Sequence, residues 1–154
     1  MQLGDFLDFD AISTRLSGGN KRSLLQQLAN LAGQRLGMDS ATILASLAER
    51  EQLGSTGFGH GVAIPHGKIE GLGRIYGMFS RLSEPIDYKA IDGKPVDLVF
   101  LLLSPPDAGA EHLKALAAVS RITRHVPTLE KIRGARSRDA LAAVLMGADE
   151  RDAA

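Results

Sequence analysis

A chain of 154 residues, 44% hydrophobic and 23% charged, suits a single globular domain with one sizeable core. Its 18 basic residues equal its 18 acidic ones, which argues against nucleic-acid binding, and the lack of cysteine excludes disulfides and thiolate chemistry. The N-terminus lacks the pattern of a signal peptide and the longest apolar run, 96–103, is too short to span a bilayer, so we expect a cytoplasmic protein without membrane insertion.

Two helices are predicted in the N-terminal part of the chain. Leucines and alanines spaced three and four residues apart indicate an amphipathic helix between Asn20 and Gly37. Asp39 or Ser40 can cap a second helix, which runs towards Arg50.

Strands are predicted in the middle of the chain. A short apolar stretch at 62–64 ends at Pro65, and a second candidate covers 74–82. Residues 96–103 are almost continuously apolar, which is typical of a central strand buried on both faces. Asp92-Gly93 predicts a turn before that strand.

Helices are predicted again after the buried strand. One helix starts near Glu111 and stops before Pro127, and Thr128 and Ser137 are candidate caps for two short closing helices. A domain at 1–147 is then followed by a polar, frayed tail at 148–154. Helices on both sides of the strands in sequence indicate an α/β fold, a single-domain sandwich whose mixed β-sheet is flanked by helices on both faces.

His66 stands in unusual surroundings. Pro65 fixes its own φ and favours an extended Ile64, while Gly67 removes side-chain bulk and lets the chain turn away. These neighbours predict a histidine presented at the rim of the sheet instead of buried in it. A neutral imidazole is a competent nucleophile for covalent group transfer. By itself, a histidine after a proline is more simply explained as a turn residue bonded to a carbonyl.

The segment around His66 carries a long signature. It reads Arg50-Glu51-x-Leu53-Gly54-Ser55-Thr56-Gly57-x-Gly59-x-Gly61-x-Ala63-Ile64-Pro65-His66-Gly67. It resembles the phosphorylation site of the phosphotransferase-system enzyme IIA family, fructose/mannitol class, and most closely the nitrogen-regulatory branch. The resemblance extends to Ala90-Ile91-Asp92-Gly93-x-Pro95-Val96-Asp97-Leu98-Val99-Phe100 and to His112-Leu113-x-x-Leu116.

The resemblance implies three catalytic residues. It makes His66 the phosphoryl acceptor, through Nε2, with His112 as a second active-site histidine and Arg50 as a supporting arginine. A phosphoryl group in transit spreads negative charge over its equatorial oxygens, and a guanidinium fork and a ring N–H are suited to stabilise them. Ser55, Thr56 and Gly67 are predicted to add hydroxyl or backbone support.

Simpler roles exist for two of these residues. Arg50 could close a helix or pair with Glu49 or Glu51 on the surface, and His112 could be an ordinary surface helix residue. The sequence does not contain the motif of a phosphate-binding loop, a dinucleotide-binding fold, a zinc site or a hydrolase nucleophile elbow. We therefore expect neither cofactor nor metal.

The resemblance implies a phosphotransferase-type relay and regulatory protein with a phosphohistidine intermediate. In the nitrogen-related system the donor would be a histidine-containing phosphocarrier protein, and the partners would be regulatory targets such as kinases or transporters. The alternative is a fructose- or mannitol-specific enzyme IIA that passes the phosphoryl group to an enzyme IIB for sugar uptake.

Overall fold

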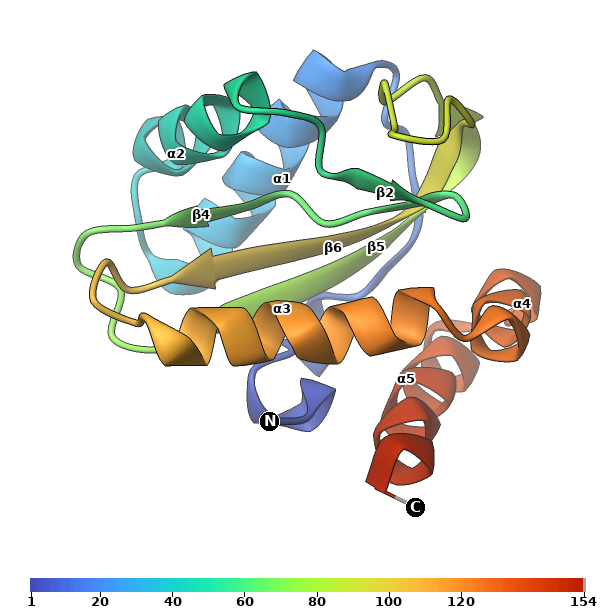
Figure 1. Ribbon diagram of the computed structural model, residues 1–154. Coiled ribbons are helices and arrows are strands. Elements are labelled where there is room, and N and C mark those ends of the chain that lie inside the picture. Colours follow the sequence, from blue (N-terminus) through green and yellow to red (C-terminus); the bar gives the residue numbers. More distant parts are fainter. Residues whose placement is uncertain (154) are drawn as a thin grey trace.

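The computed structural model describes residues 1–153, with side chains through residue 148. The described residues form one six-stranded mixed sheet and five α-helices (Figure 1). The strands are β1 (Ser13–Leu16), β2 (Gly57–Gly59), β3 (Val62–Ala63), β4 (His66–Lys68), β5 (Tyr76–Ile86) and β6 (Val96–Ser104). The helices are α1 (Lys21–Leu36), α2 (Ser40–Gln52), α3 (Ala110–Thr123), α4 (Val126–Gly134) and α5 (Arg138–Ala153), preceded by 3-10 turns at Leu3–Asp5 and Phe9–Ala11.

The sheet is built around β6. Strand β5 pairs with it antiparallel, and β3 and β4 lie parallel to it along its other edge. Strand β1 lies at one edge of the sheet, parallel to β5, and β2 lies at the other edge, antiparallel to β3. The predicted strands at 62–64, 74–82 and 96–103 are confirmed in place, although β5 continues to Ile86. Strands β1, β2 and β4 were not predicted, because segments of three or four residues carry too little periodicity.

Both faces of the sheet are buried, as the apolar run of β6 predicts. Figure 1 shows α1 and α2 on one face and α3 on the other. Leu98, Phe100 and Leu102 belong to the core with α3, α4 and α5, whereas Val99, Leu101 and Leu103 belong to the core with α1 and α2. The predicted sandwich is therefore confirmed. None of the described helices is both long and apolar enough to cross a membrane.

Polar side chains and one glycine mark the helix ends. The side chain of Asn20 accepts a hydrogen bond of 2.8 Å from the amide of Ser23, and Gly37 ends α1 in the left-handed region at φ 64°. Asp39 caps α2, as predicted. The predicted cap at Thr128 is wrong.

At the start of α4, His125 is the cap, and its Nδ1 accepts from the Thr128 amide at 3.3 Å. Pro127 lies in the first turn of α4, where its missing N–H costs nothing. The expected cap at Ser137 does open α5, because its hydroxyl accepts from the Ala140 amide at 3.0 Å.

The last helix extends beyond the predicted domain limit. The sequence predicts a frayed tail from residue 148, but α5 continues to Ala153, and Ala148 is buried in the core. After Gly147 the chain contains only alanine and charged residues without proline, so nothing in its composition stops a helix. The limit at residue 147 as a domain boundary stays a prediction.

Candidate active site

The candidate site lies where parallel strands end. His66 opens β4 opposite Leu102, two residues before β6 ends at Ser104. Helix α2 contacts β4 and brings Arg50, and α3, which follows β6, brings His112 in its first turn. The structure therefore brings together the three predicted catalytic residues from three separate elements. In open α/β sheets this edge is where ligands usually bind.

The backbone before His66 orients its ring. Proline has no N–H to donate, so Pro65 interrupts the strand, and only its carbonyl bonds to β6, accepting from the Leu102 amide at 3.0 Å. The carbonyl of Ile64 lies 2.8 Å from Nδ1 of His66. A carbonyl only accepts, so Nδ1 of neutral His66 carries the hydrogen and Nε2 carries the lone pair.

Arg50 lies directly against that lone pair. Its Nε–H donates to Nε2 of His66 at 3.1 Å, and its Nη1 donates to the carbonyl of Gly54 at 2.9 Å. Arg50 is in the last turn of α2, so the helix holds the guanidinium between the loop at Gly54 and the imidazole. A surface ion pair with Glu49 or Glu51 does not explain this placement. The other N–H groups of the fork are suited to hydrogen-bond the oxygens of an anionic group held beside Nε2.

His112 completes the site from the other side. Its ring centroid lies 5.6 Å from that of His66, with the planes inclined by 51°. Its Nδ1 lies 2.6 Å from the hydroxyl oxygen of Ser104, a residue that sequence reasoning missed. The available signal was position: Ser104 is a small polar residue ending an apolar strand, directly before Pro105.

The prediction that His66 is presented at the rim is wrong. Only 8% of His66 and 9% of His112 are exposed, because helices carrying Arg50 and His112 cover the end of β4. Burial lowers the pKa of His66 below its ordinary 6.5, and the nearby Arg50 charge lowers it further, against the opposing carbonyl of Ile64. Burial also lowers the pKa of His112, helped by His66 and Lys68. Both rings are therefore neutral at neutral pH.

This lowering predicts how the histidines titrate. A histidine whose folded pKa lies below its unfolded value contributes stability that is fully present above about pH 6.5 and is lost as the pH falls further. In an NMR titration of the ring protons, we expect both midpoints below 6.5. Urea unfolding should show a lower free energy of unfolding at about pH 5.5 than at about pH 7.5. This difference should be smaller in a His66→Gln/His112→Gln double variant than in the wild type. Midpoints at or above 6.5 would contradict the neutral, buried assignment.

The three predicted supporting residues make structural contacts of their own, and their support of a phosphoryl group stays a prediction. The hydroxyl of Ser55 accepts from the Gly57 amide at 3.1 Å and so shapes the loop. The hydroxyl of Thr56 is buried and bonded to Glu51 and Tyr88, so it supports the loop instead of pointing to His66. Gly67 does not turn the chain away, because it continues β4 opposite Leu103.

A buried polar network under the loop was also missed by sequence reasoning. Glu51 accepts from Tyr88 at 2.9 Å and forms an ion pair with Lys21 at 2.5 Å. Burial opposes ionisation of Glu51, but hydrogen bonds from Lys21, Thr56 and Tyr88 outweigh it and hold its pKa below the ordinary value. The network joins α1, α2 and the loop beside Arg50. Its members are far apart in sequence, so no local pattern reveals it.

Gly67 allows α2 to approach β4 closely. A Cβ at this position would overlap the hydroxyl of Ser46 and lie 3.1 Å from its Cβ. We expect Gly67→Ala to lower the free energy of unfolding by about 1–3 kcal/mol in urea denaturation, because the helix must move. Gly73→Ala is the matched control, since its Cβ would meet nothing within 4 Å, and Ser46→Ala should restore part of the loss. Equal stability of the two alanine variants would contradict this packing.

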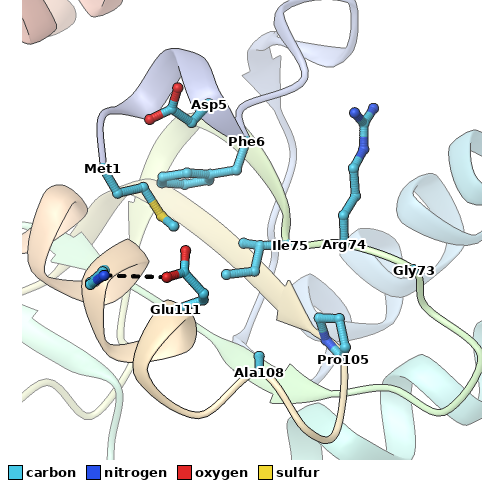
Figure 2. Close-up of a pocket in the computed structure, with 10 residues that line it drawn as sticks. Met1, Asp5, Phe6, Gly73, Arg74, Ile75, Pro105, Ala108 and Glu111 are labelled. Carbon is cyan, nitrogen blue, oxygen red and sulfur yellow. Dashed lines mark hydrogen bonds and ion pairs between the residues drawn. The ribbon is translucent and has the colours of Figure 1, made fainter.

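A hollow of about 520 Å³ lies near the site without belonging to it (Figure 2). Its walls include Phe6, Ile75 and Pro105, with the Glu111–Lys114 ion pair on one side. Neither His66 nor His112 lines it. Within the described residues, no group of three or more histidines, aspartates or glutamates is placed to hold a metal ion.

Comparison with known proteins identifies the family of this chain. Residues 5–147 match the family described as "Phosphoenolpyruvate-dependent sugar phosphotransferase system, EIIA 2". The chain belongs to this EIIA family. The family is a phosphotransferase component, so a role in phosphoryl relay or its regulation is consistent with the site.

Named relatives point towards the nitrogen-regulatory branch. The chain is 45% identical over 145 residues to a "Nitrogen regulatory protein" of Bradyrhizobium diazoefficiens, covering 94% of this chain and 95% of the relative. The crystal structure of "Nitrogen Regulatory Protein IIA-Ntr" from Neisseria meningitidis matches with a TM-score of 0.87 at 35% identity, over 93% of this chain and 98% of that one. A "PTS system fructose-specific EIIA component" of Haloferax volcanii is 39% identical over 121 residues, covering 79% of this chain and 77% of the relative.

Proposed function

We propose that this EIIA protein accepts a phosphoryl group on Nε2 of His66 from a histidine-containing phosphocarrier protein in the cytoplasm. The observation that carries the proposal is the 2.8 Å contact between Nδ1 of His66 and the Ile64 carbonyl. It assigns the hydrogen to Nδ1 and the nucleophilic lone pair to Nε2. Arg50 and His112 border the same position from α2 and α3.

The transfer is written as an in-line displacement. Nε2 of His66 attacks the phosphorus, the N–P bond of the donor phosphohistidine breaks, and its electron pair returns to the donor ring. Nδ1 keeps its hydrogen, so the ring of phosphorylated His66 carries a positive charge that the Ile64 carbonyl stabilises. That charge also offsets part of the negative charge on the phosphoryl oxygens.

Arg50 has two successive tasks in this scheme. At rest its Nε–H occupies the Nε2 lone pair, and it must leave that position when the phosphoryl group arrives. Its N–H groups then bond the equatorial oxygens, where charge-assisted hydrogen bonds are strong. Gly54 holds the guanidinium close enough to do both.

The phosphorylated state is proposed to regulate partner proteins such as kinases or transporters. A phosphoryl group adds close to two negative charges, which is a large change for a chain of formal net charge zero. The names of the nitrogen-regulatory relatives support this role. The alternative, a sugar-specific enzyme IIA that hands the group to an enzyme IIB, is supported by the fructose-specific relative at 39% identity.

One reconstitution tests the transfer and separates these roles. The protein is incubated with phosphoenolpyruvate, the upstream phosphotransferase enzyme and the phosphocarrier protein, and phosphorylation is followed by mass and by phosphorus NMR. We expect one acid-labile phosphoryl group per chain, bonded to Nε2 of His66. Rapid onward transfer to a fructose- or mannitol-specific enzyme IIB would favour the sugar-transport role, and absence of phosphorylation would contradict the proposal.

A further inference from the structure

A hydrogen bond at the end of β6 determines how His112 is oriented. Ser104 is fully buried, and its hydroxyl oxygen lies 2.6 Å from Nδ1 of His112. Its backbone is fixed as well, since Ser104 pairs with Lys68 in the sheet and its carbonyl accepts from the Ile69 amide at 2.8 Å. The hydroxyl is therefore held in place against the ring.

The direction of this hydrogen bond follows from what else the hydroxyl can reach. A serine hydroxyl can donate or accept. If Nδ1–H of His112 donated to Ser104, the hydroxyl hydrogen would need another acceptor, and none bonds it within the described residues. A buried hydroxyl hydrogen without an acceptor is costly. The favoured arrangement has Ser104 donating to a bare Nδ1.

We propose that Ser104 is a positioning residue that holds neutral His112 with its hydrogen on Nε2, so that His112 donates that N–H to a phosphoryl group on His66. The first half concerns the resting protein alone, and the second half rests on the proposed function. A neutral imidazole has a single N–H, so a donor at Nδ1 leaves the hydrogen on Nε2.

The two neighbouring histidines then have opposite tautomers for a physical reason. The partner of His66 is a carbonyl, which can only accept, so His66 keeps its hydrogen on Nδ1 and has a nucleophilic Nε2. The partner of His112 is a hydroxyl that donates, so His112 offers an N–H at Nε2. One ring attacks phosphorus, and the other donates to its oxygens. His112 does this without taking up a proton, which suits its burial.

The tautomers are measured directly in the resting protein. Two-bond hydrogen–nitrogen correlation spectra of the ring nitrogens, recorded above the titration of both histidines, report which nitrogen carries the hydrogen. We expect Nδ1–H for His66 and Nε2–H for His112. A hydrogen on Nδ1 of His112 would overturn the proposal. This measurement needs no phosphoryl donor, so it stands even if the wild type fails to become phosphorylated, a result that would instead contradict the proposed function.

Variants connect the tautomer to the reaction. In Ser104→Ala we expect His112 to exchange between tautomers and phosphoryl transfer to slow about tenfold, as with other partners that orient an imidazole. Ser104→Thr keeps the hydroxyl and should keep both the tautomer and the rate. Ser80→Ala is the matched control, because Ser80 is equally buried in the sheet but its hydroxyl has no partner within the described residues. If Ser104→Ala matched Ser80→Ala in tautomer and rate, Ser104 would have no positioning role.

Discussion

Replacing His66 with glutamine is expected to abolish phosphoryl acceptance, with a loss of at least about 10³-fold in rate. Glutamine occupies a similar volume and keeps hydrogen-bonding groups near Ile64 and Arg50, but its amide nitrogen has no nucleophilic lone pair. The effect should be complete because the proposed reaction forms a covalent bond to this atom and has no second acceptor. The check is phosphoryl incorporation from the phosphocarrier protein, followed by mass over several hours.

His60→Gln provides the matched control. His60 is an exposed histidine on the turn between β2 and β3 and has no part in the proposed reaction. Its replacement should therefore leave phosphoryl incorporation unchanged. Thermal unfolding of both variants should remain cooperative, which excludes loss of fold as the cause. Full incorporation into His66→Gln would show that another residue is the acceptor.

Arg50→Ala is expected to slow phosphoryl transfer by about 10²-fold, since it removes the charge and the donors that face Nε2. Arg50→Lys should recover only part of the rate. A lysine supplies only a point charge. The guanidinium can donate to the Gly54 carbonyl and to a phosphoryl oxygen at the same time. Initial rates with increasing phosphocarrier concentration separate a slower transfer step from weaker docking.

The control for this pair is Arg136→Ala, which removes one exposed positive charge between α4 and α5. It should leave the rate within a factor of about two, because exposed charges are screened by solvent. If Arg50→Ala behaved like Arg136→Ala, the guanidinium would have no part in transfer. A rise in phosphocarrier concentration that fully restored Arg50→Ala would assign Arg50 to docking instead.

The site shows which inferences were possible from local pattern. A long run of glycines, proline and histidine drew attention to His66, whereas His112 was identified only through the resemblance to the enzyme IIA family. The burial of His66 could not be anticipated from the sequence, because it results from the packing of α2 and α3 against the sheet. The same holds for Thr56, whose hydroxyl looked available until Tyr88, 32 residues away, proved to bind it.

Local chemistry in the sequence determined the helix ends at Asn20, Gly37 and Asp39 and the central strand β6. Helix caps, hydrophobic periodicity and proline act on residues close to them in the chain, so their effects can be predicted from the sequence. Only the tertiary structure decided the parallel pairing of β1, the close approach of α2 over Gly67, and the contact of Ser104 with His112. These features depend on contacts between segments that are far apart in the sequence. The same contacts determine which side chains are buried and which groups donate or accept hydrogen bonds.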